Sequence, residues 1–228
     1  MDRSSSRHSC SSRRFINIMK KLKILFEDKH LIIVYKEPNI STIKNEKYNG
    51  SLYEEVYDYL HKKNQRVFVV HRLDKDTSGL VLFAKSEQVK EYLQRYWDKV
   101  ERKYIALVHG ITKEEGVIKS YLMETKTLLT YSTNNKNGKY AETEYKRLMN
   151  NKQYSLLEIN LVTGRKNQIR VHMKDNNTPI LGDRKYGIKD GFRHMMLLAN
   201  KLEFIHPITH KKISIDLGIP EDYLKQIK

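Results

Sequence analysis

The stretch VFVVHRLDKDTSGLVLFAK, residues 67–85, places two apolar runs of strand length on either side of the polar segment HRLDKDTSG. Two strand ends hold such a segment rigidly, so its side chains keep a fixed direction. Asp74 lies in the middle of it, beside Arg72 and Lys75. The first question is what this carboxylate does in a chain whose formal net charge is +16.

The elements around this stretch follow no regular strand–helix–strand rhythm. Alternating or apolar runs predict strands, two of them within 22–38 and the others at 67–70, 80–84, 101–110, 138–148, 154–164, 194–207 and 211–217. Helical spacing and caps predict helices at 51–63, 86–99, 166–175 and from Glu221 onward. The NNKNG turn before 138–148 indicates a hairpin. Hairpin signals outnumber crossover signals, which predicts an α+β fold with a mixed, mostly antiparallel β-sheet and flanking helices.

Length and composition predict one domain without a membrane helix. The 228 residues suffice for one substantial core, and no apolar run approaches the roughly 20 residues of a membrane helix. A single cysteine excludes an intramolecular disulfide and favours a reducing compartment. Residues 1–18 are rich in Ser and Arg, as in a disordered tail or a transit peptide, or they precede a true start at Met19. We expect the domain to span 19–228.

The positive charge favours a polyanionic partner, of which nucleic acid is the commonest. The 15 tyrosines agree with this interpretation, because aromatic rings stack on unpaired bases. The alternative is that the charge reflects only solubility and a lysine-rich composition.

Taken alone, Asp74 allows three interpretations. It is a turn residue whose surface pairing with Arg72 contributes little to stability. It joins Asp76 in binding Mg²⁺ for phosphodiester cleavage, although no further acidic cluster completes such a site. Or it is a lone catalytic carboxylate that a neighbouring arginine keeps ionised.

Three later stretches are also ambiguous when each is taken alone. LVTGRKNQIRVHM, residues 161–173, gathers basic side chains at a strand-to-helix junction, as a phosphate site or as a solvated helix face. In RKYIALVHG, residues 102–110, Tyr104 fits an apolar core as well as a site. PILGDRKYG, residues 179–187, is a loop with more positive charge. The histidines show no zinc spacing, and no metal site is predicted.

The order and wording of these stretches closely resemble the successive motifs of the RluA-type pseudouridine synthases. HRLDKDTSGLVLFAK is followed by RKYIALVHG, TGRKNQIRVHM, PILGDRKYG and LANKLEFIHP, and ILFEDKHLIIVYKEPNIST is similar to the family's opening strands. The resemblance covers about residues 22–220. It implies isomerisation of uridine in RNA to pseudouridine: the N1–C1′ bond breaks, the base turns, and C5 bonds to C1′.

The resemblance assigns a role to each matching residue. Asp74, in HRLD, matches the essential aspartate, Arg170 matches an arginine that pairs with it, and Tyr104 matches an aromatic residue that stacks on the target uracil. Arg72 matches the arginine that enters the RNA stack when the target base leaves, and Ile169 matches a wall of the uracil pocket. We expect two further basic residues, Arg165 and Lys166, to contact RNA in a central basic cleft.

The chain departs from the family pattern at two positions. Asn167 stands where the family commonly has histidine, and KEPN replaces the usual KPxG. We also expect RNA selection to come from the catalytic domain, because residues 1–18 are too few for the S4-like domain of many relatives.

The resulting prediction is a cytoplasmic, monomeric RNA pseudouridine synthase that acts on ribosomal or transfer RNA without a cofactor and has no membrane partner. Two alternatives stay open. One is a non-catalytic RNA-binding or ribosome-assembly protein, and the other is a Mg²⁺-dependent nuclease.

Overall fold

The computed structural model describes residues 22–44 and 50–228, and the predicted disordered tail, residues 1–18, lies outside them. The strands are β1 (Ile24–Glu27), β2 (Leu31–Lys36), β3 (Phe68–Val69), β4 (Ser78–Ala84), β5 (Glu101–His109), β6 (Glu115–Glu124), β7 (Thr130–Thr133), β8 (Lys139–Asn150), β9 (Tyr154–Leu161), β10 (Leu197–Ile205) and β11 (Lys212–Asp216). The helices are α1 (Leu52–His61), α2 (Glu87–Arg95), the 3₁₀ helix η1 (Trp97–Lys99), α3 (Gln168–Asp175) and α4 (Glu221–Ile227).

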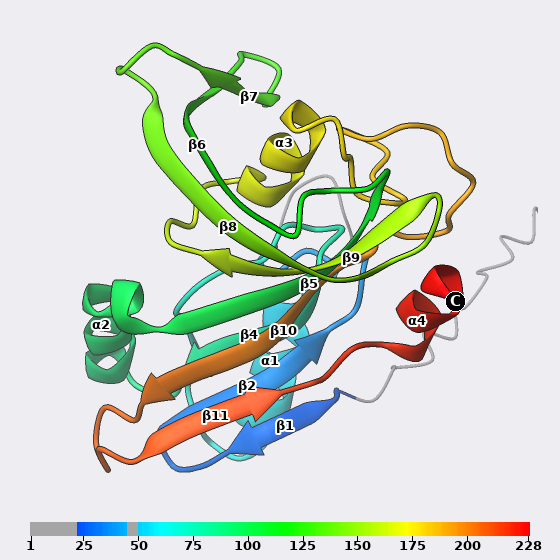
Figure 1. The fold of residues 1–228 in the computed structure, drawn as a ribbon. Coiled ribbons are helices and arrows are strands. Elements are labelled where there is room, and N and C mark those ends of the chain that lie inside the picture. The colour runs from blue at the N-terminus through cyan, green and yellow to red at the C-terminus, as the bar shows by residue number, and fades with distance from the viewer. Residues whose placement is uncertain (1–21, 45–49) are drawn as a thin grey trace, which may run out of the picture.

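These strands form one sheet in the order β1-β2-β4-β10-β5-β9-β8-β6-β7, with β11 paired to β10 and β3 to β4 (Figure 1). All its pairings are antiparallel except that of β4 with β10. The predicted α+β class with a mixed, mostly antiparallel sheet is confirmed. Gly79 makes the parallel pairing possible, because a Cβ at this position would lie 2.2 Å from the carbonyl oxygen of Ala199.

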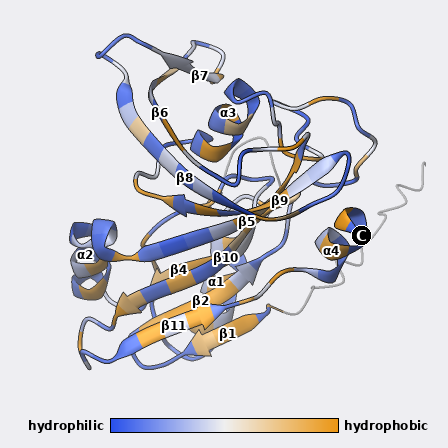
Figure 2. Cartoon of the chain, viewed as in Figure 1, coloured by the Kyte–Doolittle hydropathy of each residue, from blue (hydrophilic) through white to orange (hydrophobic). Residues whose placement is uncertain are grey.

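Alternating residues of the strands bury two opposite faces of the sheet. On one face, α1 packs on β2 and β4 through Leu52, Val56 and Leu60. The same face carries α3, whose Ile169 and Met173 pack on β5 and β9. The other face carries α2 and α4. Figure 2 shows mostly hydrophobic colour along β1 and β2 and mixed colour on the helices.

Both predicted serine caps are present at helix starts. Ser51 accepts a hydrogen bond from the Glu54 amide at 3.2 Å, and its hydroxyl donates to the Glu54 carboxylate at 3.1 Å. Ser86 accepts from the amide of Val89. The helix predicted over 86–99 is divided into α2 and η1. Across the described residues, no helix has the length and apolar character that a membrane crossing requires.

Strands β6 and β7 are absent from the predicted elements. The prediction of a hairpin at the NNKNG turn is wrong. Strand β8 follows that turn but pairs with β6 and β9, whereas β7 pairs with β6. The turn therefore joins two strands that are not neighbours. Strands β6, β7 and β8 curve around α3 in Figure 1. The start of α3 and the loop that follows β3 line one cavity.

Candidate active site

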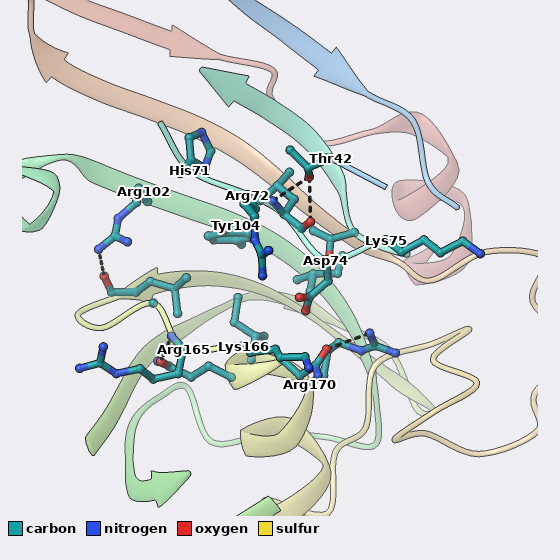
Figure 3. Close-up of a pocket in the computed structure, with 18 of the residues that line it drawn as sticks. Thr42, His71, Arg72, Asp74, Lys75, Arg102, Tyr104, Arg165, Lys166 and Arg170 are labelled. Atoms are coloured by element: carbon teal, nitrogen blue, oxygen red, sulfur yellow. Dashed lines mark hydrogen bonds between the residues drawn. The ribbon is translucent and has the colours of Figure 1, made fainter. Parts of the chain in front are cut away.

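A cavity of about 580 Å³ opens on the sheet face that carries α1 and α3. Tyr104 packs against the apolar clusters beneath both helices and lies at their junction. All the residues predicted for the site line this cavity: Arg72, Asp74, Tyr104, Arg165, Lys166, Ile169 and Arg170. Figure 3 shows that they come from the β3–β4 loop, from β5, and from the start of α3 and the loop before it.

The loop that carries Asp74 is held at several points. The Thr77 amide donates to the Asp74 carbonyl at 3.2 Å and closes a turn. The buried hydroxyl of Thr42 accepts from the Leu73 amide at 3.1 Å and donates to the Leu73 carbonyl at 2.9 Å (Figure 3). Both backbone groups next to Asp74 are thereby fixed, so the position of its carboxylate is set by the fold.

A fully buried lysine supports the same turn from below. The ammonium of Lys36, at the end of β2, donates to the carbonyls of Glu37 at 3.0 Å, Ile40 at 2.8 Å and Lys75 at 2.9 Å. All three of its donors are used. Burial lowers the pKa of Lys36 to about 8, against the opposing effect of the nearby carboxylates of Asp76 and Asp74. Lys36 is therefore a cation near the site at neutral pH.

Arg170 does not make the ion pair with Asp74 that we predicted. Its guanidinium makes a two-point contact with the buried carboxylate of Asp183, at 2.8 and 2.7 Å, and lies 3.3 Å from Asp76. Asp183 takes the position of partner because its Oδ1 also accepts from the amides of Lys185 and Tyr186 at 3.0 Å each. A buried arginine needs such a partner, and Asp183 supplies it from within the PILGDRKYG loop.

The electrostatics of Asp74 therefore differ from the expectation. Burial raises the pKa of Asp74 above its ordinary value, although the positive charges of Arg170 and Lys36 oppose this effect. The neighbouring Asp76 raises the pKa further, because two like charges close together disfavour ionisation. The carboxylate is thus held in a poorly solvated position, where its ionised form depends on the cations around it.

Tyr104 is the aromatic floor of the cavity. Burial, together with the charge of Asp74, raises the pKa of Tyr104 to about 12, while Arg102 acts in the opposite direction. Its hydroxyl is therefore protonated throughout the neutral range and can donate a hydrogen bond. The flat ring offers a surface on which a base can stack.

The loop before α3 brings its basic residues to the rim. Arg165 is exposed and donates to the carbonyl of Tyr140 at 2.9 Å, and Lys166 forms an ion pair with Glu124. Buried Ile169 is part of the wall. Arg72 is exposed, and its side chain points toward the cavity in Figure 3. The rim is therefore positively charged, as expected of a surface that meets RNA phosphates.

Asn167, the departure from the family pattern, has a structural place. It precedes α3 in the left-handed conformation, with φ 55°, which asparagine tolerates better than most residues. Its amide donates to the Thr130 hydroxyl at 3.3 Å, and its oxygen accepts from Arg170 at 3.3 Å. Asn167 thus helps to position Arg170.

Four residues near the site were not predicted: Lys36, Thr42, Arg102 and Asp183. A lysine after the apolar run LIIVY looks like a strand end facing solvent, and a threonine in a loop has no distinctive signal. Asp183 had one usable signal, since it is the only carboxylate of the basic motif PILGDRKYG.

The two aspartates of the DKD segment do not extend into a larger acidic site. Within the described residues, no three His, Cys, Asp or Glu side chains are grouped so that they could hold a metal ion. Asp76 instead contacts Arg170.

Similarity to known proteins identifies the family of the chain. A family model described as RNA pseudouridylate synthase matches residues 30–175. The "Uncharacterized RNA pseudouridine synthase YjbO" of Bacillus subtilis is 32% identical over 214 residues, which cover 91% of this chain and 76% of the relative. The "Ribosomal large subunit pseudouridine synthase C" of Rickettsia typhi is 34% identical over 224 residues, which cover 93% and 74%.

A solved structure supports the fold. "Human RNA Pseudouridylate Synthase Domain Containing 4" superposes with a TM-score of 0.73 at 21% identity, over 89% of this chain and 90% of that one. The family match spans the Asp74 loop, Tyr104 and α3. The chain therefore belongs to the RNA pseudouridylate synthase family, and its enzyme class is that of the isomerases.

Proposed function

We propose that this protein isomerises specific uridines in RNA to pseudouridine, with Asp74 as the essential carboxylate. The observation that carries the proposal is the position of Asp74, at the wall of a 580 Å³ cavity that also contains the Tyr104 ring and the buried Arg170. Cavities of this size suit a single small ligand such as a nucleoside. The type of reaction is the one that gives the chain's family its name.

The reaction rearranges bonds without any net gain or loss of atoms. The N1–C1′ bond breaks, the base turns, C5 bonds to C1′, and the hydrogen on C5 leaves as a proton while N1 gains one. The ionised carboxylate of Asp74 acts on the nucleotide as nucleophile or base, and the Tyr104 ring holds the uracil by stacking. Arg170 and Lys36 favour the ionised carboxylate that either role requires.

The target nucleotide must leave its stack to reach this cavity. Such extrusion costs a few kcal/mol when the base is stacked or paired. Contacts between RNA phosphates and the basic rim, including Arg165 and Lys166, offset this cost. Exposed Arg72 lies where it can occupy the space that the extruded base leaves.

Ribosomal RNA of the large subunit is the substrate that we favour. The support is that relatives from Rickettsia and Blochmanniella bear the names ribosomal large subunit pseudouridine synthase C and D. Transfer RNA is the second candidate. With either substrate, the protein would act where these RNAs mature, which we place in the cytoplasm.

Tritium release tests the proposal. RNA carrying tritium at C5 of uridine, prepared from a strain that lacks the protein, is incubated with the wild type, Asp74→Asn or no enzyme, with EDTA present. We expect release by the wild type alone, with the RNA chain intact on a gel and with Asp74→Asn still binding it. Release by Asp74→Asn at the wild-type rate would overturn the role of Asp74. Tight binding without any release by the wild type would favour a non-catalytic RNA-binding protein.

A further inference from the structure

The cavity also extends past Tyr104, on the side away from Asp74. We call this part the Arg102 compartment; its lining residues are His71, Trp97, Arg102, Leu161 and Gly164. In Figure 3, Arg102 and His71 lie on one side of the Tyr104 ring and Asp74 lies on the other. The proposed chemistry at Asp74 and Tyr104 leaves this compartment without a role.

The Arg102 guanidinium is fixed in place without a carboxylate partner. Its Nε donates to the Val100 carbonyl at 3.3 Å, and one terminal nitrogen donates to the Leu161 carbonyl at 3.2 Å. The group lies over the Trp97 ring, 5.6 Å from its centre. In the described part of the chain, no carboxylate lies within 4.0 Å of the Arg102 guanidinium, and the charge of Asp98 acts on it only from farther away.

The second terminal nitrogen, Nη1, faces Gly164. A Cβ at this glycine would lie 2.9 Å from Nη1, so the absence of a side chain gives the guanidinium its space. Among the described residues, Nη1 has no hydrogen-bond acceptor, in contrast to the other two nitrogens. An arginine that is oriented by two carbonyls and one ring, with donors left over, is arranged to receive an anion.

The surroundings of Arg102 are consistent with an anionic ligand. Burial lowers the pKa of Arg102, because the cation is poorly hydrated there, and an anion would offset this cost. Burial also lowers the pKa of His71 to about 3, so this ring is neutral. The Leu82 amide donates to its Nε2 at 3.0 Å, which leaves the proton on Nδ1 and makes the ring a donor as well.

We propose that the Arg102 compartment binds a phosphodiester group of the RNA, one of the two that flank the target uridine. This inference rests on the proposed function. A uridine bound at Asp74 and Tyr104 carries its two flanking phosphates with it, and these are the nearest anions that such a substrate provides. The planar donor set of a guanidinium matches the oxygens of a phosphate.

A double-substitution experiment tests this contact. The RNA is a short oligonucleotide that contains a uridine which the wild type converts to pseudouridine. In two versions of it, the phosphate on the 5′ or on the 3′ side of that uridine is replaced by an uncharged methylphosphonate. Each RNA is assayed with the wild type and Arg102→Met. Lys212→Met is the matched control, because it removes one positive charge on β11, away from the cavity.

We expect Arg102→Met to raise KM about 10- to 100-fold on the all-phosphate RNA, as for loss of a charged hydrogen bond, with much less effect on kcat. At one of the two positions, the methylphosphonate should raise the KM of the wild type and of the Lys212→Met control by a similar factor. It should not raise the KM of Arg102→Met any further. Gly164→Ala, which displaces the guanidinium but keeps its charge, should raise KM in the same direction.

The inference would be overturned if, at both phosphates, the methylphosphonate raised the KM of Arg102→Met by the same factor as the KM of the wild type. A wild-type KM for Arg102→Met would also overturn it. A purely structural role would lower the unfolding midpoint of Arg102→Met without removing its sensitivity to the methylphosphonate. These outcomes differ from failure of the proposed function, in which the wild type itself would form no pseudouridine on any RNA tested.

Discussion

Replacing Lys36 with methionine tests how the fold supports the carboxylate of Asp74. Methionine has a similar length and can occupy the buried space, but it offers no donor to the carbonyls of Glu37, Ile40 and Lys75. The last of these carbonyls belongs to the turn that follows Asp74. The substitution therefore loosens this turn and removes a positive charge near the carboxylate.

The structure gives the size of the effect. An unsatisfied buried polar group costs about 1–3 kcal/mol, and three carbonyls lose their partner, while relief from a buried charge offsets part of the loss. We expect the free energy of unfolding to fall by about 3 kcal/mol. Because a nearby cation favours the ionised carboxylate, its loss should raise the pKa of Asp74 and move the acid limb of kcat to higher pH.

Urea titration and the pH dependence of tritium release measure the two effects. Lys85→Met is the matched control: Lys85 is nearly as buried, and its ammonium contacts Glu27 at 2.8 Å and the Asp28 carbonyl at 2.6 Å. It does not line the cavity. This control should lose stability and keep the acid limb of the wild type.

If Lys36→Met kept the stability and the acid limb of the wild type, Lys36 would not support the Asp74 turn. An equal shift of the acid limb in Lys85→Met would also contradict a specific role of Lys36, because the shift would then reflect general loosening. A further check uses linkage. Since the pKa of Lys36 is about 8 in the folded protein and 10.5 ordinarily, the unfolded chain binds the extra proton between these values. The stability of the wild type relative to Lys36→Met should therefore rise from pH 8 to 10.5, by up to about 3 kcal/mol.

Three further substitutions have distinct expected results. Tyr104→Ala should lower kcat/KM about 10- to 100-fold through lost stacking, whereas Tyr104→Phe should bind RNA normally, and equal effects of the two on RNA affinity would contradict a stacking role. Gly79→Ala should lower the thermal midpoint sharply or prevent folding, because its Cβ would collide with the Ala199 carbonyl, and a wild-type midpoint would contradict the close approach. Asp183→Asn should cost about 3–5 kcal/mol in urea titration by leaving Arg170 with a weaker partner, and a loss below 1 kcal/mol would show that Asp76 suffices.

Local patterns were sufficient for the elements that bury one clear apolar face. Helix α1 begins where the Ser51 cap and the repeat of Leu52, Val56 and Leu60 predict it. Strands β4 and β5 were visible as apolar runs because both of their faces are covered. In these segments, the spacing of the apolar residues along the sequence matches the face of the element that is buried.

Strands β6 and β7 were missed for the opposite reason. In β6, exposed and half-buried residues alternate, and few apolar side chains mark the buried face. β7 has only four residues, and it is stabilised by pairing with β6. The pairing of β4 with β10 joins Ser78 to Leu198, which are far apart in sequence, so no local pattern could indicate it.

The residues of the candidate site were found through motif order, but their partners were not. A motif names Arg170 without showing that its guanidinium meets Asp183 and not Asp74. The burial of Lys36 depends on three carbonyls that the fold brings together, and the free donors of Arg102 depend on the position of Gly164. Such contacts are properties of tertiary structure, and no local pattern of residues indicates them.

The most direct test of Asp74 as the essential carboxylate of a pseudouridine synthase is a map of pseudouridine in large-subunit ribosomal RNA, at single-nucleotide resolution, from cells that lack the gene. The cells are complemented with the wild type or with Asp74→Asn, at equal protein levels and with equal RNA binding. We expect at least one pseudouridine to be absent without the gene, to return with the wild type, and to stay absent with Asp74→Asn. Its return with Asp74→Asn would show that Asp74 is not the essential carboxylate.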